Sequence, residues 1–327
     1  MLSRVPPAAR GGWLVAGVAT LLLILAGFTL GNYERYLIVI WLIYSISGLG
    51  LNLPIGFGQI YSLGQGGFML VGAYTTAIVT STWHLPYAVA LIASLVLAVV
   101  VGILVGLPAM RLRLFSLAIV TFAFGFMLFH VVKSFQFTGG PQGLFMDPLW
   151  LTDAFSGRAI YFFALLVAVL GLLASYSIAH SKSGRALLVV GQNETAARSL
   201  GINITYYKLA AFIFASVLGA LAGSIHAVLT SYVAPETYAA ELSVTMFAAV
   251  MIGGKGKLLG PFLGAAFIVG IPEVTQAARG LAEVIYAILF ILVVTVSPGG
   301  ILGILEGLIG RLRRGSIKAA TAGERAP

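Results

Sequence analysis

The sequence predicts an all-α polytopic membrane protein with about ten transmembrane helices. Of its 327 residues, 60% are hydrophobic and only 9% are charged, whereas about a quarter of the residues of a soluble domain are charged. A helical span needs about 17 to 20 apolar residues, so the chain has room for about ten spans but for no sizeable soluble domain. It contains no cysteine, which excludes disulfides, thiolate catalysis and Cys-based metal sites.

Apolar runs separated by short polar links define the expected spans in order. The first run, 13–30, follows Arg4 and Arg10 and is longer than the roughly 7 to 15 residues of a signal-peptide core, so we expect a retained span. The later spans are 37–53, 67–82, 86–110, 114–132, 159–178, 207–232, 242–252, 261–276 and 281–297. The chain therefore divides into a short N-terminus at 1–12, one transmembrane domain at 13–297 and a basic tail at 298–327.

The positions of Lys and Arg predict the orientation of these spans. If ten spans begin on the cytoplasmic side, 15 of the 19 basic residues lie inside, and only Arg35, Lys133, Arg158 and Arg279 lie outside. Such a bias is the positive-inside rule, and it places both termini and the polar segment 182–208 in the cytoplasm. The net charge of +9 then reflects orientation and contact with anionic lipid, and it does not indicate nucleic-acid binding.

A break in the helical pattern is expected at 54–68, PIGFGQIYSLGQGGF, between two spans. Four glycines from Gly56 to Gly66 disfavour an uninterrupted helix. Irregular backbone at membrane depth persists only where protein or water satisfies its polar groups, so a re-entrant segment here would line a pathway; a tight cytoplasmic turn is the alternative. The pathway candidates in this segment are Gln59, Tyr61, Ser62, Gly64, Gln65 and Gly66.

Two ionisable residues within later spans are further pathway candidates. His226 and Glu273 both fall toward the outer half of their spans, and ionisable residues at such depth are costly and often functional. Alternatively, each side chain reaches the membrane interface and has no role in transport.

The polar segment 182–208 is predicted to contain a short helix of about two turns. Asn193 can cap it, Glu194 lies in its first turn with Arg198 four residues later, and Gly201 is a stop signal. Because so short a helix is marginal alone, it needs a surface to dock against. An apolar face for docking is supplied by Ala196, Ala197 and Leu200. The segment is either a solvated loop helix or an element that transmits movement from a separate cytoplasmic protein.

Sequence patterns typical of catalysis are absent. The four histidines have no metal-ligand spacing, and the glycine cluster 253–258 lacks the Ser or Thr of a phosphate-binding loop. We therefore expect no enzymatic activity, no metal and no cofactor, with energy taken from a gradient or from a partner. Proton-coupled carriers usually place several carboxylates near the membrane middle, and this sequence offers none there.

An ordered set of motifs resembles the permease subunits of ABC importers for branched-chain amino acids, from about Gly48 to Gly303. The matching stretches are Ser62-Leu63-Gly64, Gly72-Ala73-Tyr74, Leu112-Arg113-Leu114, residues 117–121 (LAIVT), Thr138-Gly139-Gly140-Pro141, Gly184-Arg185-Ala186, Asn193-Glu194 with Ala196-Ala197, Gly201-Ile202-Asn203, Lys208-Leu209, Pro235-Glu236, Gly253-Gly254, Gly260-Pro261 and Pro298-Gly299-Gly300. Each motif is weak alone, and the order makes the set specific.

The resemblance implies a bacterial inner-membrane permease domain that is driven by partners. These are cytoplasmic ATP-binding subunits that hydrolyse ATP, a second permease subunit, identical or homologous, and an extracytoplasmic solute-binding protein. The resemblance assigns ATPase coupling to Gly184, Arg185, Asn193, Glu194, Ala196, Ala197, Arg198, Leu200 and Gly201. Candidates for contact with the binding protein are Gly139, Gly140, Pro141, Pro235 and Glu236.

Departures from the family pattern bear on the substrate. Gln65 stands where many relatives have His, Phe115-Ser116 replaces Gly-Asp, and Lys255 and Lys257 are charged where relatives usually are not. Branched-chain or other hydrophobic amino acids are the expected substrates. Urea, short amides, aromatic amino acids or other small organic solutes are the alternatives, and an ion-coupled carrier, a channel or a membrane enzyme are the other classes considered.

Overall fold

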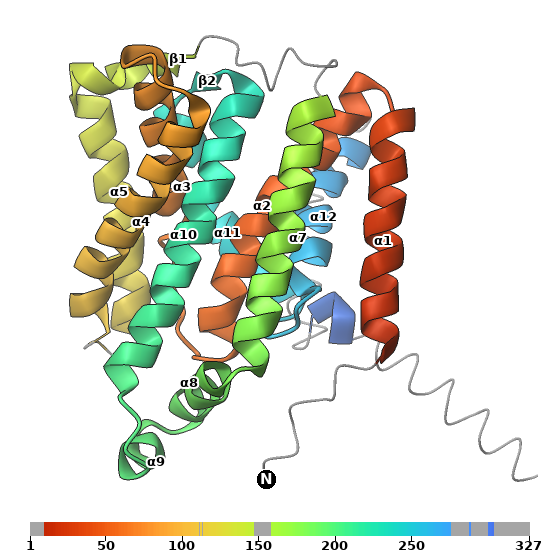
Figure 1. Cartoon of the computed structure of the whole chain (residues 1–327). Coiled ribbons are helices and arrows are strands. Elements are labelled where there is room, and N and C mark those ends of the chain that lie inside the picture. The colour runs from red at the N-terminus through yellow and green to blue at the C-terminus, as the bar shows by residue number, and fades with distance from the viewer. Residues whose placement is uncertain are drawn as a thin grey trace, which may run out of the picture.

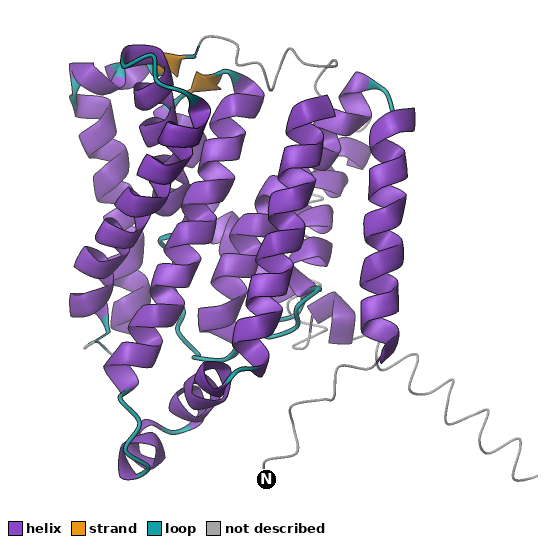
Figure 2. Cartoon of the chain, viewed as in Figure 1, coloured by secondary structure: helices purple, strands orange, loops and turns teal. Residues whose placement is uncertain are grey.

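A computed structural model describes residues 10–110, 112, 114–146, 158–275, 288 and 300–303. Almost every described residue belongs to a helix, and one small sheet lies at the upper end of the molecule in Figure 2. The expected span 281–297, apart from Ile288, lies outside the described residues, as does most of the basic tail.

Helices of 13 to 27 residues make up the bundle (Figure 1). They are α1 (Arg10–Thr29), α2 (Asn32–Gly56), α3 (Gln65–Ala77) with its π-helical extension η1 (Ile78–Thr82), α4 (Tyr87–Ala109), α5 (Leu114–Ser134), α7 (Arg158–His180), α10 (Ile204–Thr230), α11 (Ala240–Gly253) and α12 (Gly260–Thr275). Among the described residues, α2, α4, α7, α10 and residues 116–134 of α5 are long and apolar enough to cross a membrane. The chain is thus an all-α membrane protein with several apolar helices.

Helices α2 and α10 form the centre of the bundle. The most apolar stretch of α2 is 78% buried and that of α10 is 72% buried, against 22% for α4, whose outer face carries exposed Val, Leu and Ile. Contact between α10 and α3 requires glycine: a Cβ on Gly223 would lie 1.9 Å from the Met69 carbonyl oxygen, and one on Gly72 would lie 2.0 Å from that of Ala220. The small-residue spacing Gly219/Gly223 therefore serves helix packing.

Two expected boundaries are corrected by the structure. Helix α2 runs through Pro54 to Gly56, so the break predicted at 54–68 is limited to Phe57–Gly64, and helix resumes at Gln65. The polar segment 182–208 holds two helices instead of one, α8 (Lys182–Gln192) and α9 (Glu194–Ser199). Helix α8 was missed because only one short helix, capped at Asn193, was expected in this segment; the residues of α8 do carry an amphipathic pattern, with Gly184, Leu187 and Val190 buried on one face.

Short elements close the end of the molecule opposite α8 and α9, and two of them pair although they lie nearly ninety residues apart in the sequence. Strand β1 (Leu144–Phe145) is antiparallel to β2 (Tyr232–Val233), and the 3-10 turns η2 (Gln136–Thr138), η3 (Gly140–Gln142) and η4 (Pro235–Tyr238) surround them. We call this group, residues 135–146 and 231–239, the loop cap.

Candidate functional site

The broken segment, residues Phe57–Gly64, makes a turn at Phe57 and Gly58 at the end of α2 and then runs back along that helix. Gln65, the first residue of α3, donates from Nε2 to the Ser47 carbonyl at 3.0 Å and to the Ala215 carbonyl at 3.3 Å. Ser47 lies nine residues before the end of α2 at Gly56, which is roughly 13 Å of helix. Helix α3 therefore begins part-way along α2, in the interior of the bundle.

Side chains from two neighbouring helices satisfy the backbone of the broken segment. The Leu63 N–H donates to Thr121 Oγ1 of α5 at 2.9 Å, and the Gly66 N–H donates to Ser243 Oγ of α11 at 2.9 Å. Both hydroxyl residues are buried. This arrangement meets the requirement that irregular backbone inside a bundle finds protein partners. Sequence reasoning noted Thr121 only as the last residue of the 117–121 motif and missed Ser243, because the pairing joins residues far apart in the chain.

The predicted pathway residues fall in three places. Ser62, Gly64, Gln65 and Gly66 are buried together at the start of α3, while Gln59 is exposed in a left-handed conformation with φ 50° and Tyr61 packs edge-on against Phe247. His226 does not join them, since its Nδ1 lies 2.8 Å from the Tyr238 hydroxyl at the loop cap. Glu273 is at that same end, where it accepts a hydrogen bond from the Tyr33 hydroxyl at 2.7 Å.

A glycine loop closes the other end of the broken segment. Asn52 of α2 donates from Nδ2 to the Lys257 carbonyl at 2.9 Å and accepts from the Gly256 N–H at 2.8 Å, which fixes the link between α11 and α12 beside Gly56. Lys255 in this link lies 5.9 Å from the centre of the Tyr61 ring. The loop rejected as a phosphate site thus packs against the predicted pathway segment.

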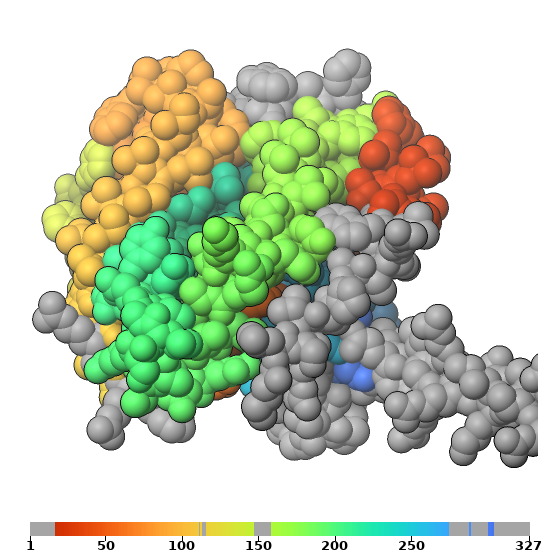
Figure 3. Space-filling model, turned by 60° about the horizontal axis from the view of Figure 1, so that its bottom comes forward, coloured from red at the N-terminus to blue at the C-terminus, as the bar shows by residue number. Residues whose placement is uncertain are grey.

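Helices α8 and α9 project beyond the bundle at the end opposite the loop cap (Figure 1), and Figure 3 shows them in green on that face. Three side-chain caps build this region: Ser181 accepts from the Gly184 N–H, Asn193 from Ala196 and Asn203 from Tyr206, at 3.0 to 3.3 Å. A side-chain cap of this kind satisfies an N–H group in the first turn of a helix, so these caps mark where α8, α9 and the next helix, α10, begin. The predicted cap at Asn193 is confirmed.

The predicted stop at Gly201 is confirmed as well. Gly201 has φ 73°, its N–H donates to the Arg198 carbonyl, and the Ile202 N–H donates to the Ala197 carbonyl. These two bonds form a Schellman motif, in which a left-handed glycine ends the helix.

Expectations for the surface of α9 hold only in part. Ala197 is fully buried against Val190 of α8 and Ile204 of α10, so it packs inward and does not belong to an exposed docking face. Ala196, Arg198 and Leu200 are exposed, Leu200 by 70%. Glu194 forms its ion pair with Lys208 of α10, although the sequence spacing had suggested Arg198.

The remaining coupling candidates lie on α8. Gly184 is buried, and a Cβ there would lie 2.3 Å from the Ile178 carbonyl oxygen, so glycine is required where α8 turns away from α7. Arg185 is exposed and donates to the His180 carbonyl at 3.1 Å.

At the loop cap, the structure brings together the two predicted docking loops. Gly139 and Gly140 adopt left-handed conformations beside Pro141, and Tyr232 donates from its hydroxyl to the Gln142 carbonyl at 2.7 Å. Lys133 pairs with Glu236 at 2.9 Å. The hydrogen bond from Lys133 is the main reason that the pKa of Glu236 is lowered.

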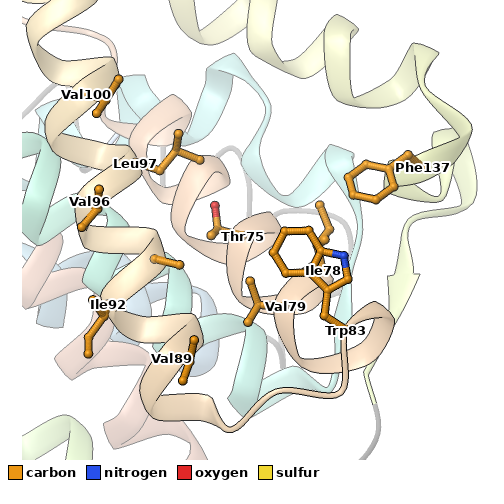
Figure 4. A pocket seen from close by; sticks show the side chains of 11 residues that line it. Thr75, Ile78, Val79, Trp83, Val89, Ile92, Val96, Leu97, Val100 and Phe137 are labelled. Atoms are coloured by element: carbon orange, nitrogen blue, oxygen red, sulfur yellow. The ribbon is translucent and has the colours of Figure 1, made fainter.

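The described surface is hollowed near the loop cap and beside α4. One hollow of about 640 Å³ is apolar and lies between α4 and the α3–η1 helix, bounded by Trp83 and Phe137 (Figure 4). Another, of about 400 Å³, lies below the loop cap between α2, α11 and α12, and is lined by Tyr44, Glu236, Glu241 and Thr245 among others. The apolar hollow contains none of the predicted pathway residues.

A bundle of apolar helices, with one helix that starts in its interior and a helical pair projecting at one end, defines a membrane transport subunit. The model of the family described as branched-chain amino acid transport system / permease component matches residues 33–296. The chain belongs to this family.

Similar proteins carry the same description. The chain is 30% identical over 310 residues to the high-affinity branched-chain amino acid transport system permease protein LivM of Salmonella typhimurium, which covers 86% of this chain and 72% of that protein. The LivM protein of Escherichia coli K12 gives the same figures. A probable branched-chain amino acid permease, LivH of Methanocaldococcus jannaschii, is 26% identical over 78% of this chain and 87% of its own length. The resemblance inferred from the ordered motifs is confirmed.

Proposed function

We propose that this chain passes branched-chain or other hydrophobic amino acids across a bacterial cytoplasmic membrane, driven by separate ATP-binding subunits that dock on α9. The observation that carries the proposal is the projecting pair α8 and α9. Helix α9 is held by the buried Ala197 and by the Glu194–Lys208 ion pair, yet it presents Leu200, 70% exposed, to the surroundings. An apolar side chain exposed on a firmly held helix suits a protein partner.

The positions of the basic side chains support a cytoplasmic location for this pair. At the end that carries α8 and α9 lie Lys182, Arg185, Arg198, Lys208, Lys255 and Lys257, and at the opposite end lie Arg35, Lys133 and Arg158. Among the basic side chains that the structure describes, this distribution of six against three follows the positive-inside rule. In this orientation ten spans have both termini inside, and the loop cap faces outward.

The other proposed partners follow from this orientation. The loop cap, with Gly139, Gly140, Pro141, Pro235 and Glu236, receives the extracytoplasmic binding protein, and a second permease subunit completes the pathway. The solute passes the interior start of α3, where Ser62, Gly64, Gln65 and Gly66 gather. This chain holds no nucleotide or other cofactor, and its ATP-binding partners hydrolyse ATP.

A pull-down from detergent-solubilised membranes tests the docking site. The tagged wild-type chain should recover an ATP-binding subunit, and Leu200→Arg should reduce the recovery at least about tenfold, because an unpaired charge then faces the centre of the contact. Phe145→Arg is the matched control: it places the same charge on a 77% exposed apolar residue of the loop cap and should leave the recovery unchanged.

One outcome would overturn the proposal. If the wild-type chain recovers no ATP-binding subunit in several mild detergents, while the purified chain alone supports leucine flux into liposomes, the protein is a carrier or channel. Ala197 is unsuitable for this experiment because its substitution would disrupt the packing of α9 on its own chain.

A further inference from the structure

Helix α8 lies against the broken segment with direct contact between the two backbones. A Cβ added to Gly191 would lie 2.4 Å from the Phe57 carbonyl oxygen and 2.9 Å from the Gly58 carbonyl carbon. Only glycine allows this approach, since real Cβ contacts are essentially never below 3.0 Å. The contact therefore joins the helical pair that faces the cytoplasm to the segment that leads into the bundle.

Side chains of α8 and of the broken segment pack beside this backbone contact. A Cβ on Gly58 would meet Leu187 Cδ1 of α8 at 3.0 Å and Ile60 Cδ1 at 2.9 Å, and both of these side chains are buried in one apolar cluster. Close-packed groups of this kind have little free volume, so displacement of one displaces the other.

Helix α9, which faces the proposed partner, is fixed to α8 and α10. Val190 of α8, Ala197 of α9 and Ile204 of α10 form one buried cluster, and the Glu194–Lys208 ion pair adds a polar tie from α9 to α10. A force applied to α9 is consequently delivered to α8, including Gly191, which lies two residues before Asn193, the residue that joins the two helices.

The far end of the broken segment is tied to other helices. Leu63 donates to Thr121 of α5, Gly66 donates to Ser243 of α11, and Gln65 bonds carbonyls of α2 and α10. Between these ties and Gly58 lie only Gln59 to Ser62. A displacement at Gly58 thus has a short path to the start of α3.

We propose that the contact of Gly191 with Phe57 and Gly58 transmits movement of α8 and α9 to the broken segment, making Gly191 a positioning residue for transport. This inference rests on the proposed function, because it takes the docked ATP-binding subunit as the source of the movement. It adds a receiving element, the broken segment beside α2, to the long helices α7 and α10 that flank the pair.

The absence of cysteine from the sequence permits a direct test. Gln59→Cys places a single thiol on the exposed part of the broken segment, and its labelling rate by a membrane-impermeant maleimide is measured in the complete complex with and without a non-hydrolysable ATP analogue. The rate should change severalfold on nucleotide binding. Adding Gly191→Ala should abolish the change while the ATP-binding subunit still co-purifies.

Two further variants give a graded control. Gly58→Ala should weaken the nucleotide response only partly, because its Cβ would lie 2.9 to 3.0 Å from two side-chain ends and the Pro54 carbonyl oxygen, whereas a Cβ on Gly191 would lie 2.4 Å from a backbone oxygen. Gly270→Ala, in α12, has nothing within 4 Å of the added Cβ and should leave the response intact. A protein that merely lost packing at Gly191 would fall in yield and in recovery of its partner, and would not show an intact complex with a lost response.

The possible failures are distinguishable. If no ATP-binding subunit accompanies the wild-type chain, the proposed function fails. If the subunit is present and the Gln59→Cys rate does not respond to nucleotide, or responds equally with Gly191→Ala, the transmission contact is wrong and the proposed function stands.

Discussion

The two ends of the molecule are built in different ways. At the end with α8 and α9, short helices are held by a buried apolar cluster and by an ion pair in which the Lys208 side chain is only 11% exposed. At the loop cap, the corresponding ion pair joins Lys133 and Glu236 side chains that are 38% and 54% exposed, next to a sheet of two residues per strand. The more buried contacts suit the first end to transmit force, and the more exposed contacts suit the loop cap to a weaker association.

The difference shows how a membrane protein can stabilise loops outside its apolar bundle. Charges kept from water interact strongly, whereas exposed charges are screened. If the comparison holds, substitutions at the end with α8 and α9 should cost more stability than substitutions at the loop cap.

The largest effect is expected for Gly184→Val. Its side chain would overlap the Ile178 and Ala179 carbonyls, since even a Cβ lies 2.3 and 2.5 Å from them. Overpacking typically costs about 1 to 3 kcal/mol, so the thermal unfolding midpoint of the solubilised chain should fall by several degrees. Gly17→Val, on α1 with open space around it, is the control, and an equal fall there would show that α8 has no special packing at this position.

A smaller effect is expected for Glu194→Gln. The change leaves the Lys208 ammonium, largely withdrawn from water, without its counter-charge. Hydrogen bonds to charged groups contribute roughly 1.5 to 3 kcal/mol, and because the Glu194 side chain is 48% exposed to solvent screening, the loss should lie at or below the lower end of that range. Unfolding of the variant in detergent and denaturant would measure the loss. The double change with Lys208→Met should recover part of it; if the double variant is as unstable as the sum of the two single changes, the pair is not coupled.

The loop-cap pair should contribute less. A double-mutant cycle with Lys133→Ala and Glu236→Ala is expected to give a coupling free energy of about 0.2 to 1 kcal/mol, as for other exposed pairs. A value above that of the Glu194–Lys208 pair would reverse the comparison between the two ends.

The smallest effect is the pH dependence of that coupling. Because the hydrogen bond from Lys133 lowers the pKa of Glu236 in the folded protein, the stabilisation is present above the unfolded pKa of a glutamate, about 4.3, and is lost as pH falls through the lowered pKa. The cycle repeated at pH 7 and under acid should show coupling only at pH 7. Persistent coupling under acid would mean that the charge of Glu236 is not its source.

The sequence determined the class, the order of helices and the local signals. Composition and apolar runs predicted an all-α membrane protein, and the ordered motifs indicated the family, because lipid imposes long apolar helices that are visible in any single stretch. The cap at Asn193, the stop at Gly201 and the break within 54–68 were equally readable, since each depends on the conformation of a few neighbouring residues.

Tertiary structure alone decided what each of these elements touches. The break runs back to the level of Ser47, and Ala197 faces inward. Glu194 pairs with Lys208 instead of Arg198, and Gly191 meets Phe57. Each of these contacts joins residues that are distant in sequence. Such contacts depend on how helices pack in three dimensions, and apolar helices in a bundle can pack in many ways that leave the same hydropathy pattern. The sequence around Gly191 therefore does not indicate its proposed role, because it shows only a glycine near the end of a short helix.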